Sequence, residues 1–321
     1  MYAISILRVV RDVVFFNIVG LFVVSLHSMR HPRPLLLSII ALLMSSCSVS
    51  RHAAVAEYPT IKEGYSHKGI LEECIYECSV EGPRERRMLV YLPADYYDTE
   101  ERYPVLYLLH GAQGNETSWI NKGDLLQNID SLTTHGLMRR SIVVLPNTNQ
   151  HNSDRDYGKS RIKGALEAFF ENDGMVEYAF VDDVVAKVDR TYRTIPEKSA
   201  RAIAGLSIGA LQSIHITANH PDMFDYVGLF SPMVHPVPHP SKHCAFYRKL
   251  KRKHKEQFAT APELYWVMIG RTDFFYPRMI AYHNYLERNA YEHEYRTTRG
   301  GHQWYNWEDY SILFMQRLWG N

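Results

Sequence analysis

Cysteine and net charge are both scarce in this sequence. Its 321 residues include only 4 cysteines, and 36 basic side chains almost balance 35 acidic ones, for a formal net charge of +1. Such a balance argues against a nucleic-acid-binding surface. Internal repeats, low-complexity stretches and cysteine spacings typical of metal ligands are also lacking. We therefore expect no repeat architecture, no metal and no cofactor.

The few cysteines say little about disulfides. Cys74 and Cys78 lie in a predicted strand, 70–80, which would hold them about 13 Å apart, too far for a disulfide. Cys244 could pair with either of them.

Long hydrophobic runs are scarce too, and the one at 35–44 is too short to span a bilayer comfortably. Basic residues precede it, and Ser45, Ser46 and Cys47 follow it, which is the pattern of a secretory signal. The cysteine at the cleavage point resembles that of a bacterial lipoprotein signal, so we expect Cys47 to carry the lipid. An ordinary signal peptide with a chance cysteine and a membrane helix are the alternatives.

This pattern divides the chain into a leader (1–46), a tether (47–60) and a single folded domain (61–321). A second apolar run precedes Met29 and is redundant with the first. We therefore expect translation to begin at Met29, with 1–28 as a start-site artefact; a genuine membrane anchor is the alternative. The exported protein would sit on a bacterial membrane, in the periplasm or at the cell surface.

The most informative motif is G-x-S-x-G around Ser207. A short strand of small and β-branched residues leads into it, and a helical pattern follows. A sharp strand-to-helix turn places the serine in a strained conformation, and glycines two residues to either side remove side chains that would collide. The serine would then lie at a helix N-terminus, where free N–H groups favour negative charge.

Upstream, the continuous apolar run 104–109 predicts a strand buried on both faces. It ends at His110, where a glycine-bearing loop can offer a backbone N–H to an oxyanion. We expect the N–H groups of Ala112 and Ile208 to form this oxyanion hole. A plain turn at His110 is the alternative.

The expected acid is Asp273, which follows another buried strand, 264–270. An acid between the serine and a later histidine matches the order Ser, Asp, His of the α/β hydrolases. It would orient the histidine and stabilise its protonated form. The competing acids are Asp182, Asp183, Asp222, Asp225 and Asp309, of which the first two are expected on a solvated helix face within 178–191.

The expected base is His302, on a glycine loop before a final amphipathic segment, 307–319. Such a loop can bring an imidazole within hydrogen-bond distance of the serine. His215, His254 and His283 fall within helical patterns and are expected to be packing or surface residues. A further group resembles a metal site, but intervening prolines break its register, so a loop is expected there: His235, His239, His243 and Cys244.

Aromatic side chains near these loops could line a pocket for an aromatic or sugar group. Ordinary core or surface positions are the alternative for each of them. The candidate substrate-binding residues are His110, Gln113, Trp119, Tyr276 and Trp304.

Several segments resemble, in order, the esterase D-like branch of the α/β hydrolases. This branch includes feruloyl and acetylxylan esterases of carbohydrate esterase family 1, S-formylglutathione hydrolases, enterochelin esterases and mycolyltransferases. The family often has methionine where this chain has Ile208, and glycine where it has Ala210; both changes keep a backbone N–H. The matching segments are RMLVYLP (87–93), YPVLYLLHG (103–111), VVLPN (143–147), RAIAGLSIG (201–209) and GGHQW (300–304).

The resemblance implies an α/β-hydrolase fold, with a mostly parallel central sheet, helices on both faces and an antiparallel edge formed by 69–92. It implies a serine esterase that acts through an acyl-enzyme on an ester substrate and needs no cofactor. Together with the leader it favours acetyl or feruloyl esters on plant polysaccharide. The alternatives are a siderophore esterase, an acyltransferase and, in a different class, a non-catalytic carbohydrate-binding protein on this fold; the oligomeric state is left open.

Overall fold

The computed structural model describes residues 68–80, 85–150, 171–235 and 242–320. The predicted leader, the tether, the Met29 start and the lipidation site Cys47 lie outside these ranges. Within them, no helix has both the length and the apolar character that crossing a membrane requires.

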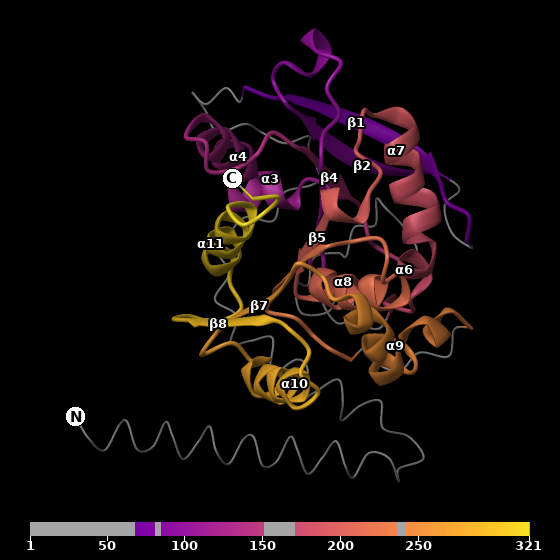
Figure 1. The fold of residues 1–321 in the computed structure, drawn as a ribbon, viewed down its shortest axis with the longest axis vertical. Helices are drawn as coiled ribbons and strands as arrows, with labels where there is room; N and C mark the ends of the chain where they lie inside the picture. The colour runs from indigo at the N-terminus through magenta and orange to yellow at the C-terminus, as the bar shows by residue number, and fades with distance from the viewer. Residues whose placement is uncertain (1–67, 81–84, 151–170, 236–241, 321) are drawn as a thin grey trace, which may run out of the picture. The chain divides into compact units, whose positions relative to one another are not determined.

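Eight strands form one sheet in the order β1-β2-β4-β3-β5-β6-β7-β8 (Figure 1). The strand β1 pairs with β2, and β2 with β4, in antiparallel fashion, whereas every other neighbouring pair is parallel. The predicted antiparallel edge is therefore confirmed. The strands are β1 (Ile70–Glu77), β2 (Glu85–Leu92), β3 (Val105–Leu109), β4 (Ile142–Pro146), β5 (Arg201–Leu206), β6 (Tyr226–Phe230), β7 (Leu264–Gly270) and β8 (Glu294–Thr298).

The central strands are apolar throughout because both of their faces are covered. Every residue of β3, β4, β5 and β7 is buried. Helices cross over between successive parallel strands, so the sheet has no solvent-exposed face at its centre. This is why the sequence shows continuous hydrophobic runs here and no alternation.

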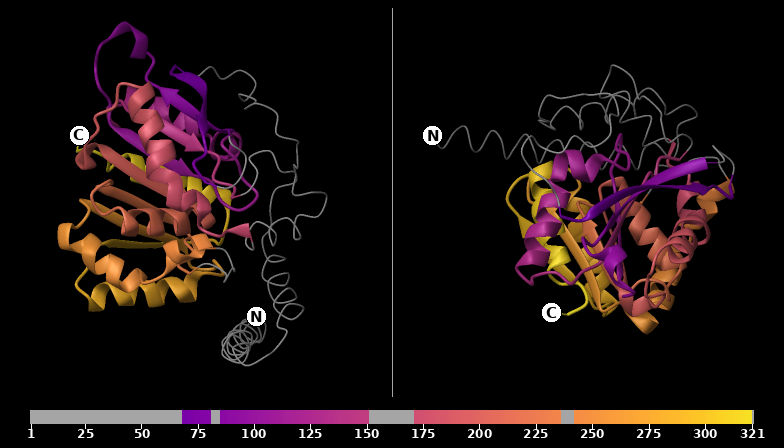
Figure 2. Two further views of the ribbon diagram at one scale, coloured as in Figure 1. Left: turned by 90° about the vertical axis from the view of Figure 1, so that its right-hand side faces the viewer. Right: turned by 90° about the horizontal axis from the view of Figure 1, so that it is seen from above.

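Helices cover both faces of the sheet (Figure 2). One face packs against α3 (Ser118–Gly123), α4 (Leu125–Thr134) and α11 (Trp304–Met315). The other packs against α6 (Met175–Phe180), α7 (Ala186–Thr191), α8 (Ile208–Asn219), α9 (Leu250–Gln257) and α10 (Tyr276–Arg288). The predicted α/β-hydrolase architecture is confirmed.

Three predicted boundaries need correction. The expected helix 178–191 begins at Met175 and contains a π-helical segment, Val181–Val185, between α6 and α7. The expected strand 70–80 ends at Glu77, so Cys78 lies outside it. The C-terminal helix begins at Trp304, directly after the histidine loop.

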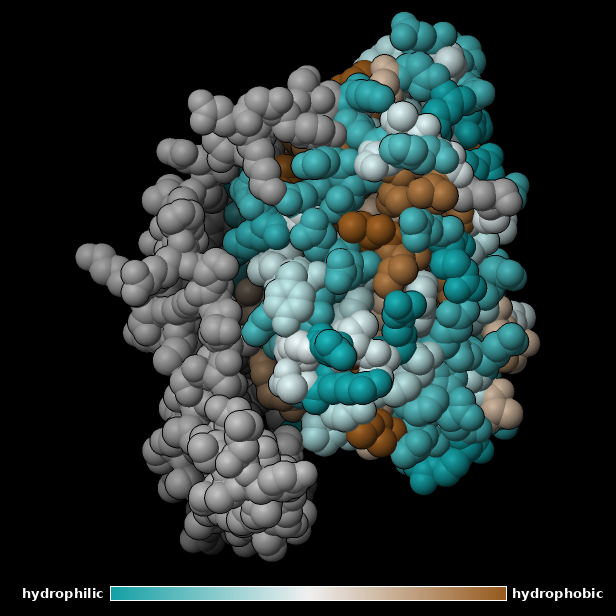
Figure 3. All heavy atoms as spheres, turned by 90° about the vertical axis from the view of Figure 1, so that its left-hand side faces the viewer, coloured by the Kyte–Doolittle hydropathy of each residue, from teal (hydrophilic) through white to brown (hydrophobic). Residues whose placement is uncertain are grey.

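The surface offers no broad apolar face on the side shown in Figure 3, where hydrophilic residues predominate and hydrophobic ones form small groups. The exposed large apolar side chains of the described residues come from separate segments. They are Ile75, Tyr97, Leu137, Tyr178, Ile280 and Tyr305.

Candidate active site

Ser207 lies at the turn between β5 and α8 with φ 55° and ψ −112°. A positive φ is uncommon for a residue with a side chain and costs of order 1–3 kcal/mol. The backbone N–H of Ser207 donates to Phe230 O at the end of β6 (2.9 Å), and its carbonyl accepts from Leu211 N (3.1 Å). The strained turn is therefore held by the neighbouring strand and by the first turn of α8.

The two glycines of the motif are required by close approach. A Cβ on Gly205 would lie 2.5 Å from the carbonyl carbon of Gly209. A Cβ on Gly209 would lie 2.4 Å from His110 O at the end of β3. Backbone atoms would be displaced in both cases, so only glycine allows the helix to start this close to the strands.

The structure brings Ser207, His302 and Asp273 together in one chain of hydrogen bonds. His302 Nε2 is 3.0 Å from Ser207 Oγ, and His302 Nδ1 is 2.9 Å from Asp273 Oδ2. With a carboxylate at Nδ1, that nitrogen carries the proton, and the lone pair of Nε2 faces the serine hydroxyl. The hydroxyl can then donate its proton to Nε2.

Asp273 is fixed on both of its carboxylate oxygens. It is 3% exposed, and its second oxygen, Oδ1, accepts from Phe275 N (2.9 Å). By contrast, the competing Asp222 and Asp309 are exposed. Asp183, expected on a solvated face, is buried and accepts from Ser79 N (2.9 Å), so that expectation is wrong.

The loops after β7 and β8 hold Asp273 and His302 against each other. Thr272 N donates to Gly300 O (3.0 Å), and Asn306 Nδ2 donates to Gly301 O (2.8 Å). Gly300 has φ 88°, a conformation that favours glycine. The histidine loop is therefore tied to the acid loop on one side and to α11 on the other.

Three aromatic rings surround the imidazole of His302. Its ring centroid lies 4.4 Å from that of Phe274, 5.4 Å from that of Phe275 and 4.8 Å from that of Trp307. The Trp307 indole N–H in turn donates to Ser231 Oγ (3.1 Å). No sequence pattern predicted that these rings would surround the histidine, although Phe274 and Phe275 directly follow Asp273 in the chain.

The loop after β3 lies against the serine turn, where the oxyanion hole is expected. A Cβ on Gly111 would approach Ser207 Cβ to 3.4 Å. Ala112 lies within the turn that Gly114 N closes on Gly111 O (3.0 Å). Ile208 is the first residue of α8, ahead of the first i→i−4 bond of that helix, so its N–H has no acceptor one turn back.

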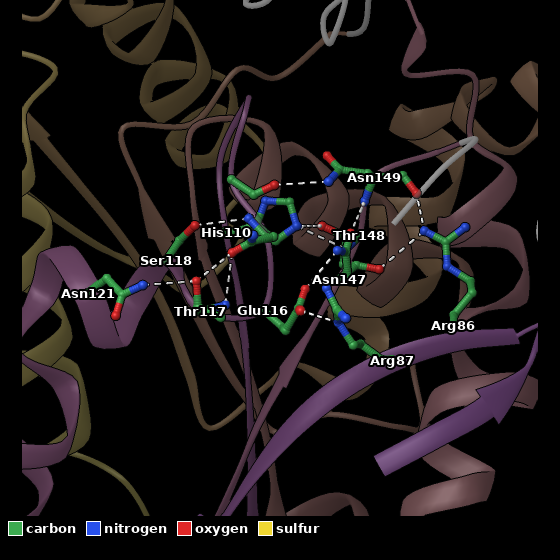
Figure 4. Close-up of polar contacts among 12 residues, drawn as sticks. Arg86, Arg87, His110, Glu116, Thr117, Ser118, Asn121, Asn147, Thr148 and Asn149 are labelled. Carbon is green, nitrogen blue, oxygen red and sulfur yellow. Dashed lines mark hydrogen bonds and ion pairs between the residues drawn. The ribbon is translucent and has the colours of Figure 1, made fainter. Parts of the chain in front are cut away.

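His110 fixes the start of this loop. Its Nδ1–H donates to Gly111 O (2.8 Å), and its Nε2 accepts from Thr148 N (3.0 Å) after β4 (Figure 4). Burial lowers the pKa of His110 to about 4, so the ring stays neutral and keeps this donor and acceptor arrangement. His110 is 4% exposed, so it supports the loop and offers no surface to a substrate.

A second set of polar contacts ties the same loop to β2 and β4 (Figure 4). Buried Glu116 pairs with Arg87 and accepts from Asn147 Nδ2 (2.7 Å). Asn149 Nδ2 donates to Gly114 O (2.9 Å), and Arg86 donates to Asn147 O (3.2 Å). The position of Ala112 is thus set by several strands at once.

The candidate pocket residues separate into two groups. Trp119 is 1% exposed, donates its indole N–H to Leu109 O (3.1 Å) and packs edge-on against Trp304, so it belongs to the core and its predicted pocket role is wrong. Gln113, Tyr276 and Trp304 are half-buried and keep accessible surface.

The other histidines and cysteines partly follow expectation. His215 and His254 are buried among aromatic rings, as expected for packing residues. Cys74, Cys78 and Cys244 form no disulfide with one another. Of the four residues considered above as a possible metal site, His239 lies outside the described residues.

One family model and several curated proteins are similar to this chain in sequence. The model of the Esterase family, described as "Putative esterase", matches residues 79–310. An endo-1,4-beta-xylanase/feruloyl esterase from Xylanibacter ruminicola is 36% identical over 147 residues, which cover 44% of this chain and 19% of that protein. An endo-1,4-beta-xylanase Y from Acetivibrio thermocellus is 28% identical over 155 residues, or 45% of this chain and 12% of that protein. The chain therefore spans less than a fifth of each of these curated relatives.

Solved structures share the fold. A CE1 ferulic acid esterase from Anaeromyces mucronatus aligns with a TM-score of 0.62 at 24% identity, over 83% of this chain and 96% of that one. An S-formylglutathione hydrolase from Staphylococcus aureus aligns with a TM-score of 0.58 at 17% identity, over 78% of this chain and 98% of that one. The family match covers more than half of the chain, and the chain therefore belongs to the Esterase family.

Proposed function

We propose that the chain is a serine esterase in which Ser207, His302 and Asp273 act as a catalytic triad. The observation that carries the proposal is the continuous pair of hydrogen bonds from Ser207 Oγ through His302 to Asp273 Oδ2. Ser207 Oγ attacks the ester carbonyl carbon as its proton moves to His302 Nε2. Asp273 keeps Nδ1 protonated and stabilises the imidazolium that results.

The tetrahedral oxyanion accepts hydrogen bonds from the N–H groups of Ala112 and Ile208. When the intermediate collapses, the ester C–O bond breaks and His302 gives its proton to the leaving alcohol. Water, deprotonated by His302, then attacks the acyl-enzyme and releases the carboxylic acid. The buried rings of Phe275 and Trp307 beside His302 exclude water from the imidazole faces and strengthen its charged hydrogen bonds.

We further propose acetyl or feruloyl esters of plant polysaccharide as the substrates. The name of the Xylanibacter relative includes feruloyl esterase, and the Anaeromyces esterase has been solved in complex with ferulic acid. In this chain, the half-buried rings of Phe274, Tyr276 and Trp304 follow the two catalytic loops and offer apolar surface for an aromatic acyl group.

The test is a substrate panel with purified protein: p-nitrophenyl acetate, feruloylated arabinoxylan fragments, acetylated xylan and a siderophore ester, with released acids measured by chromatography. We expect kcat/KM for a polysaccharide ester to exceed that for the siderophore ester by about tenfold or more. If only the aryl ester is hydrolysed, the proposal of a serine esterase stands, but the proposed polysaccharide substrates are rejected. No turnover of any ester would reject the triad.

We also propose that the protein is exported and anchored through a lipid on Cys47, which rests on the sequence pattern at 35–47 alone. Cys47→Ser should move the protein from the membrane fraction to the soluble fraction, because a lipoprotein carries several acyl chains whereas one alone binds membranes only marginally. Fractionation and the mass of the native N-terminus measure this. Cys78→Ser, at a half-buried cysteine, is the matched control and should stay with the membrane. An unchanged fraction together with an unmodified N-terminus would contradict the anchor.

A further inference from the structure

Two histidines and a glutamate meet where α10 leads into β8, two elements that lie side by side in Figure 1. His283 and Glu287 are one helical turn apart on α10, so they share a face of the helix. His293 directly precedes β8. His283 Nδ1 is 2.8 Å from His293 Nε2, Glu287 Oε1 is 3.9 Å from that same Nε2, and the three ligand atoms all lie within 4.8 Å of one another.

These distances suit a bound transition-metal ion. In a tetrahedral zinc site with bonds of about 2.0–2.1 Å, neighbouring ligand atoms are roughly 3.4 Å apart. The 2.8 Å and 3.9 Å separations bracket this value, so shifts of about half an ångström, available to unstrained side chains, would place all three atoms around one ion. Two imidazoles and one carboxylate are ligand types that zinc accepts.

The surroundings of the histidines independently favour ligation. His293 Nδ1–H donates to Tyr291 O (2.7 Å), which fixes the tautomer whose Nε2 lone pair faces His283. Metal-ligating histidines almost always have such a partner on the other ring nitrogen. The His293 side chain is only 1% exposed, so its Nε2 is held in place.

His283 is oriented as well. Its ring stacks on Tyr295 of β8, with centroids 4.3 Å apart and an interplanar angle of 9°. The Glu287 carboxylate is exposed and gives an ion a path from solvent.

We propose that His283 Nδ1, His293 Nε2 and the Glu287 carboxylate bind a divalent transition-metal ion of the zinc class, with water completing the coordination. This site is separate from the esterase chemistry, and it differs from the sequence-based expectations that the chain binds no metal and that His283 is a packing or surface residue. The ion would replace the proton shared between the two imidazoles. It would fasten α10 to β8, and this unit begins just after Asp273 and ends just before His302.

The proposal is tested with metal-stripped protein that carries no polyhistidine tag, titrated calorimetrically with ZnCl₂ and melted with and without about 100 µM free zinc. We expect one equivalent of zinc to bind. A Kd of about 1 µM would raise Tm by on the order of 5 °C at this zinc concentration. Cobalt(II) should give a tetrahedral d–d spectrum without a thiolate charge-transfer band, because the three ligand atoms are nitrogen and oxygen.

Two variants assign the ligands. His293→Ala should abolish binding, and Glu287→Gln, a conservative change at an exposed side chain, should weaken it about tenfold or more. The control is His135→Ala, at an exposed histidine directly after the C-terminus of α4, which should bind zinc as the parent does. No zinc-induced Tm shift in the parent, binding unchanged in Glu287→Gln, or a thiolate band with cobalt would each overturn the site.

Discussion

Ser207→Ala should abolish ester hydrolysis while the fold stays intact. Removing the nucleophile of such a triad lowers kcat by on the order of a millionfold, since nothing remains to form the acyl-enzyme. The folded state should tolerate alanine because the Ser207 hydroxyl bonds only to the His302 ring among the described contacts, and the backbone conformation is already held by Phe230 and Leu211. The measurements are kcat/KM on p-nitrophenyl acetate and the thermal melting curve.

Ser213→Ala is the matched control for this variant. Ser213 is a second buried serine, less than two turns further along α8, and its hydroxyl donates to Gly209 O (2.8 Å). Its loss should cost about 1 kcal/mol of stability and leave turnover within a few fold of the parent. If Ser207→Ala keeps activity within about tenfold of the parent, Ser207 is not the nucleophile.

Asp273→Asn should lower kcat/KM by on the order of ten-thousandfold, whereas Asp309→Asn should have little effect. An asparagine can present an amide donor to His302 Nδ1, which favours the tautomer that cannot accept the serine proton. Asp309 is the competing acid nearest to His302 in the sequence, but it is exposed on α11. By contrast, Asp273 Oδ2 is 2.9 Å from His302 Nδ1. The measurement is kcat/KM for both variants on an activated ester.

Double variants separate a triad from three independent effects. His302→Ala alone should cost activity as severely as Ser207→Ala, and combining either His302→Ala or Asp273→Asn with Ser207→Ala should add little. A base without a nucleophile has no proton to take, and an orienting acid has nothing to orient. Additive losses in the double variants, or a loss in Asp309→Asn that Asp273→Asn does not show, would reject Asp273 as the acid.

The sequence by itself determined the architecture and the order in which the proposed serine, acid and histidine follow one another along the chain. Strands buried on both faces read as continuous apolar runs, so β3 and β7 could be placed almost to the residue. Gly205 and Gly209 are required because a Cβ on either would collide with nearby backbone atoms at the turn. This requirement produces a motif of five consecutive residues, which can be recognised in the sequence. His302 could likewise be predicted from local sequence, because it follows two glycines directly before the final helix.

Only the tertiary structure decided which residues touch across the sheet. The sequence favoured Asp273 as the acid because it directly follows a buried strand, but its contact with His302 is a hydrogen bond between residues 29 positions apart, which no local pattern encodes. Trp119 was expected to contact the substrate, but it is buried in the core, where Trp304 of α11 packs against it. His283 and His293 meet only because α10 packs beside β8. The rings around His302 meet because the loop after β7 and the start of α11 lie together. Local spacing sets which strands, helices and turns form, whereas contacts between distant segments depend on how those elements pack.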